Sequence, residues 1–156
     1  MVRLSRFRKC LLRSACLTAA VFMPTGSPSD VSQPPLDSRI LKVDAFFESY
    51  GCPLPHHAGE YVRAADLYQI DYRVLPAISL LESTCGAFQR GNNHWGWNSA
   101  QTRFASVADG IDFITRQLAL GDPYRDRDLD AKLFSYNPTA AYVRAVKRLI
   151  DEIDGY

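Results

Sequence analysis

The chain has 156 residues, of which 47% are hydrophobic and 22% are charged, and its formal net charge is +1. This length fits one domain, and the composition excludes a chain that is disordered throughout. The small net charge gives no long-range attraction to nucleic acid or acidic lipid. The sequence also holds no nucleic-acid motif, no phosphate-binding glycine loop and no internal repeat. We therefore expect no nucleic-acid partner.

The first 37 residues differ in character from the rest. Basic residues open the chain, an apolar stretch of about ten residues follows, and a segment rich in Pro and Ser ends near residue 37. This order is typical of a secretory leader and a linker. The apolar stretch is too short for a membrane-spanning helix, which needs about 20 residues. We predict a leader over 1–26, a linker over 27–37 and a folded domain over 38–156. The predicted location is the periplasm or the outside of the cell; a basic tail on a cytosolic protein is the alternative.

Beyond residue 37, apolar residues recur with helical spacing between turns that contain Gly, Pro or Asn. No segment carries a strong strand pattern. The sequence therefore predicts an all-α domain with helices near 41–50, 57–68, 74–84, 107–120, 128–134 and 139–153. A short β-hairpin in the Asn- and Trp-rich loop before the fourth helix is left open.

Glu82 is the sharpest candidate for chemistry. The helix predicted over 74–84 is apolar on nearly every side, which is typical of a buried helix. Glu82 follows Leu75 and Ile78 on one face of it. A carboxyl group held among apolar side chains tends to keep its proton, and such a group can protonate the leaving oxygen of a glycosidic bond. The alternative is a glutamate at a helix end that faces solvent or pairs with an arginine.

The loop after this helix, GNNHWGWNSAQTRF, is rich in Asn and Trp. Trp95 and Trp97 flank Gly96, and Asn92, Asn93 and Asn98 lie beside them in the sequence. Aromatic faces and side-chain amides suit sugar rings and acetamido groups. The alternative is that both tryptophans belong to the core and the asparagines only form turns.

Cysteine and histidine give weaker signals. Cys10 and Cys16 fall in the predicted leader, which leaves Cys52 and Cys85 as an even pair. In an oxidising compartment these two can form one disulfide, and two buried free thiols are the alternative. The three histidines lack the spacing of metal ligands, so we expect no metal ion and no cofactor.

Four short motifs occur in the order LLESTCG, NNHWGW, FASVADGIDFI and YNPTAAYVRAV. Together they resemble the bacterial glucosaminidase family (the mannosyl-glycoprotein endo-β-N-acetylglucosaminidase-like domain) of the lysozyme-like superfamily, over about residues 75–150. In that family a helix ends in Glu-Ser, an Asn-Asn-x-aromatic-Gly loop follows, and a Tyr-rich segment closes the domain. The resemblance implies a lysozyme-like fold and a secreted glycosidase that cleaves the glycan strands of peptidoglycan at a β-1,4 bond next to an N-acetylated sugar.

The resemblance also implies roles for individual residues. Glu82 matches the catalytic acid, and Tyr136 and Tyr142 both fall where the family has an active-site tyrosine. The region that lines the sugar cleft in the family corresponds to Ser83, Asn92, Asn93, Trp95, Gly96, Trp97 and Phe104.

The chain departs from the family pattern in two respects. Trp97 stands where many members carry an aliphatic residue followed by Lys, and no second carboxylate is evident, since the next acids are Asp109 and Asp112 on the following predicted helix. We therefore expect an enzyme with a single catalytic acid, and we expect it to be a monomer. The alternatives are a lytic transglycosylase-type muramidase, a catalytically inactive module that binds cell-wall glycan, and a small helical protein that docks a partner in the envelope.

Overall fold

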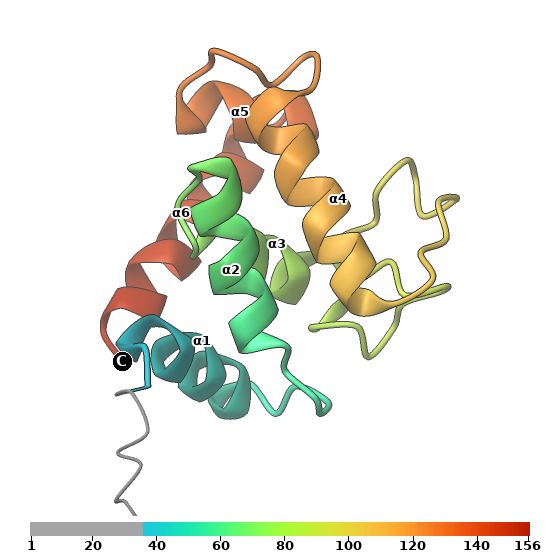
Figure 1. The fold of residues 1–156 in the computed structure, drawn as a ribbon. Helices are drawn as coiled ribbons and strands as arrows, with labels where there is room; N and C mark the ends of the chain where they lie inside the picture. Colours follow the sequence, from blue (N-terminus) through green and yellow to red (C-terminus); the bar gives the residue numbers. More distant parts are fainter. Residues whose placement is uncertain (1–35) are drawn as a thin grey trace, which may run out of the picture. The chain divides into compact units, whose positions relative to one another are not determined.

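A computed structural model describes residues 36–156, so the predicted leader and nearly all of the predicted linker lie outside the described residues. The described part is helical, and the prediction of an all-α fold is confirmed (Figure 1). Its helices are α1 (Ser38–Ser49), α2 (Ala58–Tyr68), α3 (Val74–Ser83), α4 (Val107–Leu120), α5 (Leu129–Tyr136) and α6 (Ala140–Asp154).

The helix boundaries follow local capping chemistry. α1 begins before the predicted residue 41 because the carboxylate of Asp37 accepts a hydrogen bond from the Arg39 backbone N–H at 2.9 Å. Such a cap satisfies one of the free N–H groups at a helix start. Asp128 and Thr139 cap α5 and α6 in the same way.

The loop between α3 and α4 forms no hairpin. Within this described loop, the only strand-like feature is an isolated bridge between Arg90 and Asn93. Gly91, Asn92 and Gly96 adopt left-handed backbone conformations, which interrupt any extended path. The loop instead projects beside α4, where Figure 1 shows it as the yellow-green segment.

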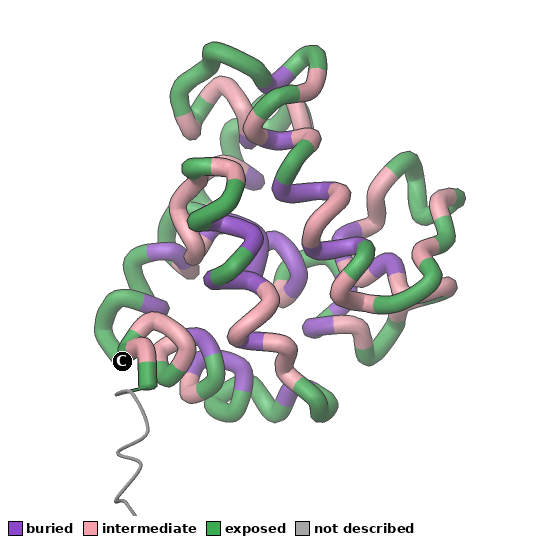
Figure 2. The backbone as a smooth tube through the Cα atoms, in the orientation of Figure 1, coloured by how far each residue is buried: buried purple, intermediate pink, exposed green. Residues whose placement is uncertain are grey.

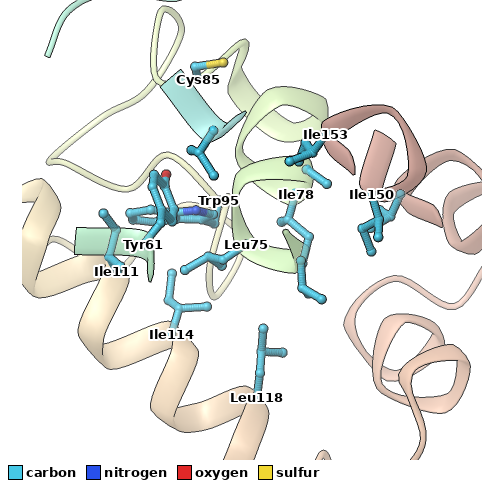
Figure 3. Close-up of a cluster of buried hydrophobic side chains, with 14 of the residues drawn as sticks. Tyr61, Leu75, Ile78, Cys85, Trp95, Ile111, Ile114, Leu118, Ile150 and Ile153 are labelled. Atoms are coloured by element: carbon cyan, nitrogen blue, oxygen red, sulfur yellow. The ribbon is translucent and has the colours of Figure 1, made fainter. Parts of the chain in front are cut away.

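The core forms around α3. This helix packs against α6, while α2 packs against α1 and α4, and the buried parts of these helices face one another (Figure 2). Apolar side chains from several helices meet in the interior (Figure 3). Trp95 from the loop joins them with no exposed surface. Gly110 of α4 permits this, since a Cβ at that position would lie 2.6 Å from the Trp95 ring.

A disulfide joins Cys52 to Cys85, with 5.5 Å between their Cα atoms. The predicted pairing is thus confirmed, and the bond connects the segment after α1 to the end of α3. None of the helices in the described part is long and apolar enough to cross a membrane.

Candidate active site

Glu82 lies in the last turn of α3, where the helix leaves the core. Leu75 and Ile78, earlier in the helix, are buried. Glu82 is exposed when the backbone and side chain of the residue are taken together. The sequence pattern places Glu82 on a buried stripe; the structure corrects this, because α3 ends at the surface with Thr84 in a left-handed conformation. The surrounding protein nevertheless crowds the carboxyl group. This partial burial raises the pKa of Glu82, and the nearby Tyr142 hydroxyl opposes part of that shift.

Gly96 brings the loop against this carboxyl group. Its φ is +63°, and a Cβ built on it would lie 3.0 Å from Oε2 of Glu82. Glycine therefore serves two purposes here: it adopts the left-handed conformation without strain and leaves room for the carboxyl group.

Gly96 also lines a surface cleft of about 410 Å³, which we call the aromatic cleft. Trp97, Tyr124 and Tyr136 form its aromatic walls. The centroid of the Trp97 ring lies 5.8 Å from that of Tyr136 and 6.0 Å from that of Tyr124. Aromatic faces with a few polar groups between them suit a sugar ring. The lining residues are Gly96, Trp97, Asn98, Ser99, Thr102, Tyr124 and Tyr136.

Tyr136 and Tyr142 lie side by side next to Glu82. Their rings are stacked, with centroids 6.1 Å apart and planes 7° from parallel. The Tyr136 hydroxyl donates a hydrogen bond to the Trp95 carbonyl at 2.5 Å. The Tyr142 hydroxyl is buried and makes no hydrogen bond of ordinary length with another described residue. Burial and the charge of Glu82 raise the pKa values of both tyrosines, so both phenols stay protonated at neutral pH.

Asparagine side chains hold the loop in shape. The Asn93 amide is buried; it donates to the Trp97 and Thr102 carbonyls and accepts from the Trp97 backbone N–H, each at 3.0 Å. Asn92 donates to the Phe104 carbonyl at 3.0 Å. These amide groups are thus engaged with the backbone, and both residues lie outside the lining of the aromatic cleft.

Ser83 and Trp95 also support the site from within. The Ser83 hydroxyl donates to the His94 carbonyl at 2.6 Å and accepts from the Gly86 backbone N–H at 2.8 Å, which ties the end of α3 to the loop. Trp95 is fully buried, and Phe104 packs edge-on against it. The resemblance implies substrate contact for these three residues. In the structure Ser83 and Trp95 are buried and support the loop from within, whereas Phe104 is half-buried and lies outside the lining of the aromatic cleft.

Asn98 is a candidate from the sequence, but three further lining residues of the cleft, Ser99, Thr102 and Tyr124, could not be recognised in it. Tyr124 reaches the cleft from the turn after α4, and Asn98, Ser99 and Thr102 come from the far part of the loop. No motif marks Tyr124, and Ser99 and Thr102 follow the recognisable NNHWGW segment without a pattern of their own.

The described lining of the cleft contains no acid, since Glu82 lies beside it, against Gly96. The next two acids after Glu82 in the sequence lie on α4 in other contacts. Asp109 accepts a hydrogen bond from the Ser106 hydroxyl at 2.7 Å, and Asp112 accepts one from the Tyr68 hydroxyl at 3.1 Å. The site therefore combines a cleft lined by Tyr124 and Tyr136 with one carboxyl group, that of Glu82, which lies against Gly96 at its edge.

Over residues 36–156, no three side chains of His, Cys, Asp or Glu cluster in a way that could hold a metal ion. Comparisons of the chain with protein-family models, with curated proteins and with solved structures give no match.

Proposed function

We propose that this protein is an exported glycosidase that cleaves the glycan strands of peptidoglycan, in the manner of an endo-β-N-acetylglucosaminidase, with Glu82 as its general acid. One observation carries the proposal: a carboxyl group of raised pKa lies beside a cleft walled by Trp97, Tyr124 and Tyr136. A protonated carboxyl group can donate to the leaving oxygen, and aromatic walls can hold the sugar ring that the oxygen leaves.

The mechanism uses one protein acid. Glu82 donates its proton to the glycosidic oxygen while the bond from that oxygen to the anomeric carbon breaks. The substrate's own acetamido oxygen attacks the anomeric carbon, and water then opens the cyclic intermediate while the Glu82 carboxylate takes the water's proton. If the 6-hydroxyl of the sugar attacks the anomeric carbon instead and gives its proton to the Glu82 carboxylate, the product is an anhydro sugar, as in a lytic transglycosylase. The proposal of a single acid is supported by the described cleft lining, which contains no carboxylate to act beside Glu82.

Tyr142 is the tyrosine best placed to assist Glu82. The Tyr136 hydroxyl already donates to the Trp95 carbonyl, whereas the Tyr142 hydroxyl has no other partner among the described residues. Once Glu82 has given up its proton, a phenol with a raised pKa stays protonated and can donate to the new carboxylate. This step favours proton transfer to the leaving group.

Two further observations support the proposed relation to the glucosaminidase family and the proposed export of the protein. The site is assembled from the same ordered segments that resemble the glucosaminidase family: the end of α3, the Asn- and Trp-rich loop, and the tyrosines near α5 and α6. The Cys52–Cys85 disulfide is typical of proteins in an oxidising compartment, which favours export.

The second candidate function is a module that binds wall glycan without cleaving it. The described cleft lining contains no acid, and Glu82 is the one carboxyl group shown against it; this favours the binding module, because most glycosidases use two carboxyl groups.

The test is digestion of purified peptidoglycan by the full chain, beside Glu82→Gln and the control Glu48→Gln. Glu48 is exposed on α1, far along the chain from the cleft lining. We expect soluble fragments from the wild type and from Glu48→Gln only, and the fragment masses distinguish hydrolysis from anhydro-sugar formation. Binding to the wall without release of fragments by any of the three proteins would contradict the enzyme and support the binding module.

A further inference from the structure

A second hollow, of about 340 Å³, lies between α1, α3 and α6. The proposed chemistry makes no use of it. We call it the Arg148 hollow, and its lining residues are Tyr50, Leu81, Ala145, Arg148, Leu149 and Glu152.

The Arg148 hollow and the aromatic cleft are each lined by a residue next to Glu82. Leu81, directly before Glu82 in α3, lines the hollow, whereas Gly96 lines the cleft and closely approaches the Glu82 carboxyl group. Along helix α6, the residue next to the cleft and Glu82 comes first and the residues that line the hollow follow. Tyr142 lies next to Glu82 and stacks on the cleft residue Tyr136, while Ala145, one turn further along the same face, lines the hollow. At 1.5 Å per residue, Arg148 lies roughly 9 Å along α6 from Tyr142.

The chemistry of the hollow differs from that of the cleft. Leu81 and Leu149 provide apolar surface, and the Tyr50 hydroxyl is 2.9 Å from each carboxylate oxygen of Glu152. Arg148 is exposed and forms no ion pair with any other residue of the described part. Its guanidinium group is therefore available to bind a carboxylate, for which its planar fork of donors is well suited.

An enzyme that cuts within a polymer holds the chain on both sides of the bond that breaks, since contacts with distant parts of the substrate position the reacting atoms. We propose that the Arg148 hollow holds the part of the glycan strand that lies across the scissile bond from the aromatic cleft, and that Arg148 binds a carboxylate carried by that part. This inference rests on the proposed function. Peptidoglycan offers such a carboxylate on the lactyl group of its sugar or on its stem peptides.

The test measures binding, so that it does not depend on turnover. The full chain carrying Glu82→Gln is titrated with three probes: neutral chitin oligomers, peptide-free glycan strands with free lactyl carboxylates, and glycan strands that keep their stem peptides. Arg148→Gln is added to that protein, and Arg144→Gln is the matched control. Arg144 lies on the same helix, is also exposed, and lines a different hollow beside α5.

We expect Arg148→Gln to weaken the binding of carboxylate-bearing strands about tenfold and to change the affinity for chitin oligomers by no more than about twofold. The control Arg144→Gln should not show this loss. A loss on peptide-free strands assigns the carboxylate to the sugar; a loss confined to peptide-bearing strands assigns it to the stem. No loss, an equal loss on chitin oligomers, or no binding of any probe would overturn the inference. If the wild type cleaves peptidoglycan but Arg148→Gln does not change the binding of carboxylate-bearing strands, only this inference is overturned and the proposed function remains in place.

Discussion

Replacement of Gly96 by alanine tests how closely the loop and the catalytic acid fit together. The new methyl group would lie about 3.0 Å from Oε2 of Glu82, so the carboxyl group must move by a few tenths of an ångström. Small displacements of a reacting group are costly, and we expect the rate of fragment release to fall about ten- to a hundredfold. The methyl group also displaces water from the carboxylate, so the pKa of Glu82 should rise further.

Gly51→Ala is a matched control for this change. Gly51 has a φ of +64°, almost that of Gly96, but a Cβ there would meet nothing within 4 Å. Both substitutions should lower the free energy of unfolding by about 1–2 kcal/mol, because alanine is strained in the left-handed region. Urea unfolding measures that shared cost, and peptidoglycan digestion measures the activity. Equal activity of the two variants would refute the proposed contact between Gly96 and the catalytic acid.

Two further predictions address the tyrosine and the disulfide. Tyr142→Phe keeps the ring stack and removes a hydroxyl without an ordinary hydrogen bond to the described residues, so the free energy of unfolding should change by less than about 1 kcal/mol. The rate should fall about tenfold, and the alkaline limb of the pH–rate profile should move to higher pH, because the hydroxyl no longer lowers the pKa of Glu82; an unchanged profile and rate would remove Tyr142 from the mechanism. The double substitution Cys52→Ser with Cys85→Ser opens a loop with a sequence separation of 33 and should lower the free energy of unfolding by about 3–4 kcal/mol; a urea midpoint equal to that of the wild type would contradict this.

The helices could be predicted from the sequence because their causes are local. Apolar residues at helical spacing place α4 at 107–120, and the turn residues before and after each helix limit the others to within a few residues. The beginning of α1 was set by the Asp37 cap, which lay in a segment read as linker. The disulfide followed from counting, since two cysteines remained after the leader.

Which loop residues are buried and which line the cleft could not be predicted from such local patterns. Trp95 and Trp97 are two residues apart and look equivalent in the sequence, yet Trp95 is fully buried and Trp97 lines the cleft. The difference depends on Gly110 of α4, where the absence of a Cβ leaves space for the Trp95 and Phe104 rings, and on the amide of Asn93, which orients the backbone at Trp97. Such contacts between distant segments leave no local pattern.

The choice between the two tyrosines has the same origin. Tyr136 and Tyr142 fit the family resemblance equally well. What separates them is the Trp95 carbonyl, which accepts from the Tyr136 hydroxyl and leaves that of Tyr142 without such a partner among the described residues. Tyr124 enters the cleft only because the chain turns after α4.

The central claim is that Glu82 works as a protonated acid, and the pH dependence of glycan cleavage tests it most directly. The rate of fragment release from purified peptidoglycan should be measured across pH for the full chain and for Glu82→Gln. A general acid acts only while it holds its proton, so the wild-type rate should fall as pH rises through a pKa above the ordinary range of a glutamate, and Glu82→Gln should release almost nothing at any pH. Partial burial disfavours the ionised form of Glu82. Glu82→Gln removes this unfavourable charge, so the variant should also fold at neutral pH. A folded Glu82→Gln protein with wild-type rates and the same pH profile would contradict the account.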